Sequence, residues 1–250
     1  MMNVTLRIIG CGDAFCSGGR YHTCFQLDFR EQVVLLDLGS TAFMPLRQAS
    51  SCLDLIDQIL ISHLHGDHFG GLPFFLLNAQ FIAKRRRPLT IAGPQGIQKR
   101  IEDTIAILFS NMGTIDWRFP LSFVELEPGD ERILGAIKVK SYEVDHPDTS
   151  PCLALRLELE DKVLAFSGDT GWTKTLIDVA DGADLFICEC HSYEPNLFSH
   201  LDWQTLNTHQ TSLRAKRILL THMSQPMLDR VPSLDQERFE FANDGLVVTF

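Results

Sequence analysis

The chain has 250 residues, 45% of them hydrophobic and 22% charged, and carries a formal net charge of −10 at pH 7. No apolar run approaches the roughly 18 residues of a membrane span, so no membrane partner is expected. The acidic balance argues against a long polyanion, because non-specific nucleic-acid affinity comes mainly from Lys and Arg. The length allows a substantial core, and we expect one domain over residues 1–250.

The compartment is suggested by the start of the chain and by its cysteines. Residues 1–15 have no basic region leading into a long apolar stretch and a cleavage site, so no secretion signal is expected and the cytoplasm is the default location. The number of cysteines is odd and they form no C-x-x-C framework, which favours reduced thiols. The seven cysteines are Cys11, Cys16, Cys24, Cys52, Cys152, Cys188 and Cys190.

The first predicted strand, residues 4–10, ends in a glycine-rich loop, GCGDAFCSGG. The loop lacks the G-K-[ST] ending of a phosphate-binding loop, and a simple turn is favoured over a wall of an active site. Two further strands are predicted at residues 23–29 and 32–38. The second ends in DLG, where Asp37 is either a turn carboxylate or the hydrogen-bond acceptor of a metal-binding histidine.

The next stretch, ILISHLHGDHFG at residues 59–70, places three histidines and an aspartate within six positions. The apolar run that opens it suits a buried strand, and Gly66 and Gly70 indicate a turn beyond its end. Imidazole nitrogen and carboxylate oxygen suit a divalent cation such as zinc, but four ligands on six residues are too crowded for one tetrahedral ion. We therefore expect two metals at His63, His65, Asp67 and His68.

The following segments alternate between helix and strand, which predicts an α/β fold. Residues 72–83 have the length of a helix and end in the basic cluster at residues 84–87. A solvated helix end is favoured for this cluster over a phosphate-attracting rim. A strand at 89–92 and a helix at 94–110 follow. Further strand-like runs lie at residues 119–126, 133–144, 152–159 and 162–167.

Three distant side chains repeat one arrangement, because each follows the end of an apolar strand. His146 comes after residues 137–144, Asp169 lies in SGDTGW, and His222 lies in LLTHMS. Neighbouring strands could bring them to one edge of the sheets, beside the first cluster. A single histidine after a strand is more often structural, but three recurrences beside H-x-H-x-D-H favour a metal site.

The motif HLHGDH at 63–68, followed in order by His146, Asp169 and His222, resembles the metallo-β-lactamase superfamily over nearly the whole chain. The resemblance implies an αββα sandwich, with two mixed sheets, helices on the outer faces and two metals at one edge. It assigns His63, His65 and His146 to one metal and Asp67, His68 and His222 to the other, with Asp169 bridging. It also implies that a bridging hydroxide is the nucleophile, with Asp67 among the catalytic residues.

Within the superfamily, the late part of the chain is similar to ribonuclease Z and to the phosphonate-pathway cyclic phosphodiesterase. Glu189 follows the strand at 184–188, and His200 lies in SHLDWQTL. In those relatives, a histidine at the place of His200 contacts the phosphate and can protonate the leaving oxygen, and a glutamate at the place of Glu189 orients it. The alternative for His200 is a cap of the helix that begins near Asp202.

The chain also departs from both relatives. The interval between His146 and Asp169 has no room for the tRNA-clamping arm of ribonuclease Z, so tRNA is not an expected partner. The His-Ser-Thr signature is replaced by His200-Leu201-Asp202, which is closer to the phosphonate-pathway branch. The compact N-terminal cysteine cluster of that branch is not reproduced, so neither a third metal nor that branch's substrate follows from the resemblance.

The leading hypothesis is a dinuclear metal-dependent hydrolase that cleaves a small or cyclic phosphodiester. Zinc is the expected metal, with manganese or iron as alternatives, and the relatives suggest a homodimer. One alternative keeps the fold but changes the bond to a lactone, a thioester or another acyl group. Another is a metal-binding sensor without turnover. His22, His191 and His209 receive no role.

Overall fold

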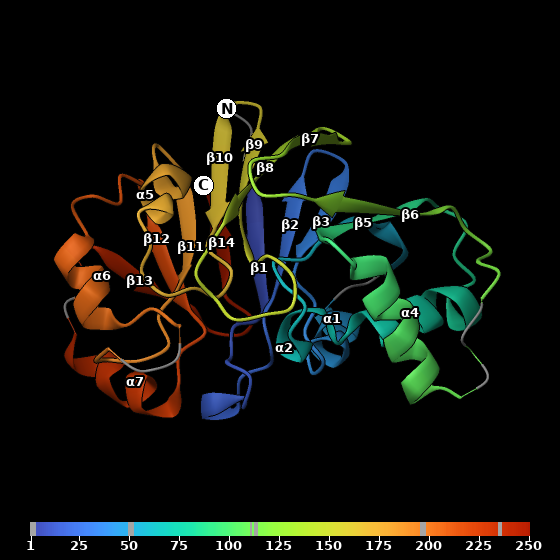
Figure 1. Ribbon diagram of the computed structural model, residues 1–250, viewed down its shortest axis with the longest axis horizontal. Helices are drawn as coiled ribbons and strands as arrows, with labels where there is room; N and C mark the ends of the chain where they lie inside the picture. Colours follow the sequence, from blue (N-terminus) through green and yellow to red (C-terminus); the bar gives the residue numbers. More distant parts are fainter. Residues whose placement is uncertain (1–3, 50–52, 111, 113–114, 196–198, 235–236) are drawn as a thin grey trace.

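The computed structural model describes residues 4–49, 53–110, 112, 115–195, 199–234 and 237–250. Within these ranges, two mixed sheets of seven strands each pack face to face (Figure 1). Helices α1 to α4 cover the outer face of the first sheet, and α5 to α7 cover that of the second. The predicted αββα sandwich is therefore confirmed.

The first sheet begins with antiparallel hairpins and continues with parallel strands, from β3 to β6. Leu35, Ile59 and Ile91 lie in register on three adjacent parallel strands, and all three are fully buried under the helices. In spatial order, its strands are β14 (Val247–Thr249), β1 (Thr5–Gly10), β2 (Cys24–Phe29), β3 (Gln32–Leu36), β4 (Ile56–Leu60), β5 (Leu89–Pro94) and β6 (Leu121–Leu126).

The second sheet has the same plan, with strands β10 to β13 parallel and β7 to β10 antiparallel. Alternate side chains of the inner strands face the other sheet. Phe25 on β2 meets Phe166 on β10 edge to face, with 5.7 Å between ring centroids. The strands are β13 (Phe239–Phe241), β12 (Ile218–Thr221), β11 (Leu185–Glu189), β10 (Lys162–Phe166), β9 (Leu153–Leu159), β8 (Ile137–Glu143) and β7 (Glu131–Leu134).

The helices are short, and most lie between consecutive strands. Those of the first half are α1 (Phe43–Ala49), α2 (Gly66–Phe69), α3 (Leu72–Leu77), the π-helix η3 (Asn78–Ile82) and α4 (Ile97–Leu108). Those of the second half are α5 (Thr175–Ala180), α6 (Trp203–His209) and α7 (Gln225–Arg230), and short 3₁₀ turns occupy Ser17–Gly19, Leu53–Leu55 and Val231–Ser233. Within the described ranges, no helix combines the length and the apolar character that crossing a membrane requires.

Three differences from the prediction go beyond one or two residues at the end of an element. The run at 133–144 is two strands, β7 and β8, because Gly135 adopts a positive φ of 59° and reverses the chain between them. The helix predicted at 94–110 starts at Ile97, since Gly96 precedes it with a φ of 85°. The turn expected after the histidine motif is one turn of helix, α2. The elements α1, α5, α7, β13 and β14 were not predicted.

The basic cluster at 84–87 follows the end of η3, and Lys84, Arg86 and Arg87 are exposed as the predicted solvated helix end requires, but Arg85 is not. Arg85 is 1% exposed, and its guanidinium donates to the backbone oxygens of Asp54, Ile56, Arg87 and Pro88 at 2.6–2.9 Å. A buried charge is tolerated when each of its donors finds an acceptor. Arg85 therefore joins the end of η3 to β4 and β5 and does not face a substrate.

The cysteines agree with the expectation of reduced thiols where the structure describes them. Cys11, Cys16, Cys24, Cys152, Cys188 and Cys190 are free, and all except Cys16 are buried. Burial raises the pKa of the Cys152 thiol to about 12, so it is protonated and unreactive at neutral pH. Cys52 lies outside the described residues.

Candidate metal centre

Seven metal-competent side chains converge at the edge of the sandwich where parallel strands of both sheets end. Strand β4 leads into the H-x-H-x-D-H segment, and β10 and β12 lead into Asp169 and His222. His146 follows β8 from the antiparallel half of the second sheet. The carboxyl ends of parallel strands share an edge, so residues far apart in the chain meet there. The convergence expected from the sequence is what the structure has.

The first group of possible ligands is His63, His65 and His146. The ring of His146 lies 5.0 Å from each of the other two rings, measured between centroids. His65 Nδ1 and His146 Nε2 are 3.2 Å apart. This spacing is close to the ~3.3 Å between two ligands of a tetrahedral ion with bonds of about 2.0 Å. The group suits one divalent metal.

The second group is Asp67, His68, Asp169 and His222, all of them buried. Asp169 Oδ2 is 3.3 Å from Nε2 of both His68 and His222, and 3.9 Å from His63 Nε2 in the first group. Asp67 Oδ2 lies 3.2 Å from His222 Nε2. The carboxylate of Asp169 thus faces both groups, as a bridging ligand would.

A network of hydrogen bonds behind the ligands orients two of the imidazoles. His68 Nδ1 donates to Asp37 Oδ2 at 2.7 Å, and Ser62 donates its backbone N–H and its hydroxyl to the same carboxylate. Because that hydroxyl hydrogen is engaged, His63 Nδ1 donates to Ser62 Oγ at 3.1 Å. Both rings therefore turn Nε2 toward the metal position. Asp37 is the hydrogen-bond acceptor of the candidate ligand His68, which is one of its two predicted roles.

The DLG turn that carries Asp37 lies against the metal segment. A Cβ atom at Gly39 would come 2.1 Å from the carbonyl oxygen of Asp67, so only glycine permits this approach. His222 has a positive φ of 59°, a strained value for a non-glycine residue, and such values often mark functional positions. The close approach at Gly39 brings the DLG turn against the metal segment, and the strained backbone of His222 places its side chain at the site.

Unsatisfied polar atoms test whether a cation fits here. Among the described residues, the buried Nε2 atoms of His63 and His68 have no hydrogen-bond partner. Buried nitrogens without partners are costly, and a coordinated cation would satisfy both. The donors are imidazole nitrogens and carboxylate oxygens, which suit a divalent metal. The residues present fit the metal that the sequence predicted.

The electrostatics of the two groups differ. Burial lowers the pKa of His63 well below its ordinary value, so its imidazole is neutral and ready to coordinate. Burial also opposes the charged form of His222, but the carboxylates of Asp169 and Asp67 outweigh it and raise the pKa of His222 to about 9. Without a metal, the second group therefore balances its carboxylates with protons on histidine.

Glu189 and His200 form a pair beside the ligands. His200 Nδ1 lies 3.1 Å from both oxygens of the buried Glu189 carboxylate and 3.9 Å from Asp169 Oδ2. The helix α6 is capped by Asp202, which accepts from the N–H of Thr205 at 2.9 Å. His200 therefore does not cap that helix, and its ring is held by Glu189 at the edge of the metal site.

A cavity of about 440 Å³ opens over the two groups, and it shows residues that sequence reasoning missed. His191 lines it and stacks on His200, with 4.8 Å between centroids. Burial and the neighbouring His200 and His222 lower the pKa of His191 to about 4, so it is neutral at pH 7. The sequence offered one signal for this role, because His191 follows the end of strand β11 as the candidate ligands follow theirs.

The glycine-rich loop is the other missed feature. Ala14 and Phe15 line the mouth of the cavity together with Pro147, so the loop is a wall of the site and not the simple turn that was favoured. His22 supports this wall because its imidazole hydrogen-bonds to the backbone of Ala14, and it accepts the N–H of Thr41 at 3.3 Å. His209 instead stacks on Trp172, with 4.0 Å between centroids.

Comparisons with known proteins identify the family and the fold of the chain. The family model described as "Anti-Pycsar protein Apyc1" matches residues 4–248. The chain is 25% identical to ribonuclease Z of Clostridium perfringens, in a match that covers 97% of this chain and 95% of that protein. The resemblance to ribonuclease Z that was drawn from the motifs is thus confirmed.

Two solved structures share the fold. The metallo-β-lactamase fold protein YhfI from Bacillus subtilis superimposes with a TM-score of 0.80 at 18% identity, covering 100% of both chains. The short form of human tRNase Z, ELAC1, superimposes with a TM-score of 0.79 at 23% identity, covering 98% of both chains. Because the family model spans nearly all of the chain and the fold is shared from end to end, this chain belongs to the family of the anti-Pycsar protein Apyc1, with the metallo-β-lactamase fold.

Proposed function

We propose that this protein is a dinuclear metal-dependent hydrolase of a small or cyclic phosphodiester. The observation that carries the proposal is the Glu189–His200 pair, in which His200 lies beside the candidate ligand Asp169 and lines the same cavity. Metal ligands alone suit many hydrolytic reactions, whereas a histidine held by a buried carboxylate supplies a proton to a leaving oxygen.

The ligand assignment that we propose follows the two observed groups. His63, His65 and His146 would hold one ion, and Asp67, His68 and His222 would hold the other, with Asp169 between them. Two divalent ions, zinc in the first instance and manganese or iron as alternatives, would supply an activated water and neutralise charge on the phosphoryl oxygens. The remaining chemistry falls to the side chains of this chain.

His200 would act at the leaving group. Burial disfavours its charged form, but the hydrogen bond to Glu189 and the charge of that carboxylate outweigh burial and raise the pKa of His200. A histidine whose pKa is raised keeps its proton to a higher pH and can donate it from Nε2, because Nδ1 is engaged by Glu189. Asp67 would position the attacking water through the second group of ligands.

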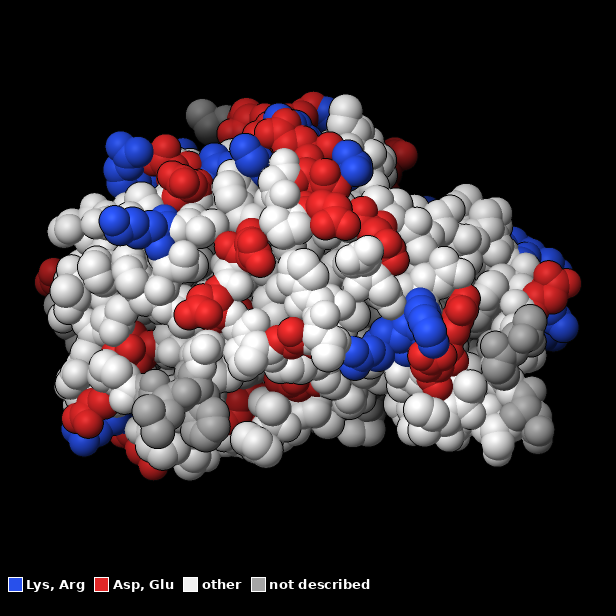
Figure 2. Space-filling view, in the orientation of Figure 1, with Lys and Arg blue, Asp and Glu red and all other residues white. Residues whose placement is uncertain are grey.

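The surface charge and the short interval between His146 and Asp169 support a small substrate over an RNA. On the face shown in Figure 2, acidic side chains run across the middle, and the drawn Lys and Arg residues gather only in small groups. Between His146 and Asp169, the described chain contains only β9, β10 and their turn. Ribonuclease Z of Clostridium perfringens and human tRNase Z are named for RNA substrates. A test of substrate preference must therefore include an RNA.

The test has two parts. The chain purified without chelator should contain close to two divalent metals, measured by elemental analysis after reconstitution. It should then hydrolyse a bis-aryl phosphodiester faster than a lactone, a thioester or an RNA. One ion or fewer would contradict the dinuclear site, and a preference for the lactone or thioester would favour the acyl alternative. A homodimer and a cytoplasmic location remain predictions.

A further inference from the structure

Phe15 is the feature of the site that the proposed chemistry does not use. Its side chain is 86% exposed, yet it lines the mouth of the cavity above the candidate ligands. A ring that is so exposed contributes little to the core. Single exposed hydrophobic residues are common on protein surfaces, so the position of Phe15 has meaning only if the loop holds it there.

The near side of the loop is held by its own aspartate. Asp13 is 1% exposed, and its carboxylate accepts from the N–H of Phe15 at 3.2 Å. The same carboxylate accepts from the N–H of Ser17 at 2.9 Å and from its hydroxyl at 2.7 Å. A buried carboxylate with three donors is an expensive group to displace. It fixes the backbone on both sides of the ring.

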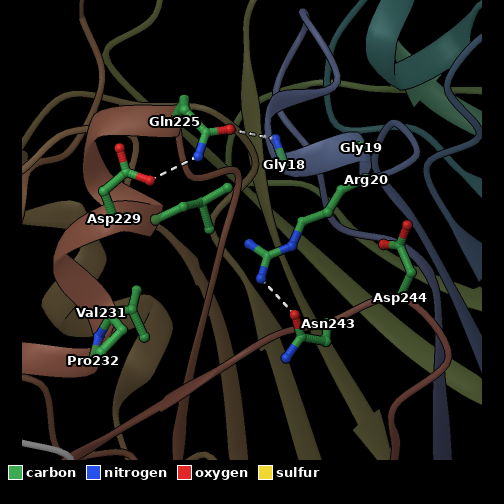
Figure 3. Close-up of a pocket in the computed structure, with 10 residues that line it drawn as sticks. Gly18, Gly19, Arg20, Gln225, Asp229, Val231, Pro232, Asn243 and Asp244 are labelled. Atoms are coloured by element: carbon green, nitrogen blue, oxygen red, sulfur yellow. Dashed lines mark hydrogen bonds between the residues drawn. The ribbon is translucent and has the colours of Figure 1, made fainter.

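The far side of the loop is held from the C-terminal part of the chain. Figure 3 shows Gly18 donating its N–H to Gln225 of α7 at 2.9 Å, and Arg20 donating to Asn243 at 2.5 Å. These bonds cross an open hollow of about 650 Å³ behind the loop. Next to it, Asp244 accepts from the N–H of Tyr21 at 2.8 Å. The loop is therefore tied to α7 and to the connection between β13 and β14, and its backbone holds Phe15 at the mouth of the cavity.

The chemistry of the cavity changes with depth. The floor carries charged and imidazole groups, whereas Ala14, Phe15 and Pro147 make the mouth apolar. A phosphoryl group on the floor would leave its organic substituent at this mouth. An aromatic residue on a backbone that is already held binds a planar substituent at a lower entropic cost than one on a mobile loop.

We propose that Phe15 determines substrate specificity by stacking on a planar ring carried by the phosphodiester. The inference rests on the proposed function, which supplies the phosphoryl group on the floor of the cavity. Phe15 selects substrates that carry such a ring over those with small aliphatic groups, and it takes no part in bond cleavage. Its contribution therefore falls on binding, and its loss leaves the metal content unchanged.

A binding experiment on the metal-reconstituted full chain tests this directly. Phenylphosphonate and methylphosphonate carry the same anionic head, and only the first carries a ring. Calorimetry should show that Phe15→Ala weakens phenylphosphonate roughly 5- to 50-fold and methylphosphonate less than about twofold. Phe15→Leu should lose nearly as much, because it keeps the apolar surface without the flat face, whereas Phe15→Tyr should retain binding.

Ile133→Ala is the matched control, since Ile133 is 78% exposed on β7 and does not line the cavity. It should bind both phosphonates like the parent chain. Equal weakening of both ligands by Phe15→Ala, or full retention by Phe15→Leu, would overturn the proposal. In the first case the loop supports the site as a whole, and in the second the contact requires no planar partner.

Turnover separates this proposal from the proposed function. The substrates are 4-nitrophenyl phenyl phosphate and 4-nitrophenyl methyl phosphate. Both release the same nitrophenolate on the side of His200, so they differ only in the substituent that stays on phosphorus, which is the one proposed to face Phe15. We expect Phe15→Ala to lower kcat/KM roughly 5- to 50-fold for the first only, mainly through KM. Hydrolysis of both diesters without a Phe15-dependent preference overturns the stacking and leaves the hydrolase. If neither is hydrolysed while phenylphosphonate binding depends on Phe15, the proposed activity fails and the stacking stands.

Discussion

His200 and Glu189 meet through one nitrogen and two oxygens: Nδ1 of the imidazole lies 3.1 Å from each oxygen of the carboxylate. Glu189 is 1% exposed and also accepts the backbone N–H of Thr170, so it cannot turn away from the ring. The buried carboxylate thereby fixes both the tautomer and the direction of His200. Nε2 is left as the atom that faces the substrate.

Removal of His200 should affect substrates according to their leaving group. For an alkoxide, which needs a proton to depart, His200→Ala should lower kcat roughly 10²- to 10⁴-fold. A nitrophenolate departs without a proton, so its release should suffer much less. Metal content should stay near that of the parent chain. His209→Ala, a histidine stacked on Trp172, is the control and should change neither rate. Equal slowing of both substrates together with metal loss would make His200 a ligand.

Replacement of Glu189 should change the pH dependence of turnover. His200 must be protonated to act as an acid, so activity falls as the pH rises through its pKa. Glu189 raises that pKa in the parent chain against the effect of burial. Glu189→Gln removes the charge, lowers the pKa of His200, and should move the alkaline limb of the pH–rate profile to lower pH. An unchanged alkaline limb would exclude His200 as the titrating acid.

Loss of Asp169 should lower the occupancy of both metal positions. Its Oδ2 atom faces His68 and His222 at 3.3 Å and His63 at 3.9 Å, so one oxygen serves both groups. Asp169→Ala removes the negative charge that offsets the repulsion between two dications. Elemental analysis should find well under two ions, with activity lost. Asp229→Ala, an exposed carboxylate on α7, should keep both ions. Normal metal content in Asp169→Ala would reduce Asp169 to a turn residue.

Metal binding should release protons. The carboxylates outweigh burial and raise the pKa of His222 to about 9 and that of His68 well above its ordinary value. Both imidazoles are therefore protonated at pH 7 before a metal arrives, and a ligand imidazole must be neutral. About two protons should be released, and affinity should rise with pH toward about 9. Calorimetry in buffers of different ionisation enthalpy measures the number of protons released. If no protons are released, both rings are already neutral before the metal binds.

Arg85 should be important for stability and not for turnover. Its guanidinium donates to four backbone oxygens at 2.6–2.9 Å, in bonds that are buried or partly buried, and Arg85→Met would remove the donor from all four. We expect a loss of roughly 3 to 5 kcal/mol in the free energy of unfolding, measured by urea denaturation. Arg86→Met removes one hydrogen bond at the surface, to Arg118, and should cost under about 1 kcal/mol. A similar small loss for Arg85→Met would show that water replaces the guanidinium.

The candidate ligands could be predicted from the chain because their pattern is local. His63, His65, Asp67 and His68 stand within six residues, and it is this crowding that predicts two ions. His146, Asp169 and His222 each follow an apolar strand, so the edge where they meet could be inferred from the order of elements. Long apolar runs also located most strands of both sheets.

Short elements and side-chain contacts were beyond that kind of inference. The strands β13 and β14 have three residues each, too few for a periodic pattern, and they form only because neighbouring strands offer unpaired edges. Arg85 stands in a run of four basic residues, and the sequence does not distinguish the buried one. Its burial depends on carbonyl groups of segments about thirty residues away.

The sequence by itself determined which residues can bind metal and at which edge of the fold they lie, because the residue types and the order of the strands follow directly from the sequence. The tertiary structure alone decided that His191 stacks on His200 and that Phe15 stands at the mouth of the site. The loop of Phe15 is held by Gln225 and Asn243, more than 200 positions away. Such contacts depend on how the two sheets pack, and no local pattern encodes that packing.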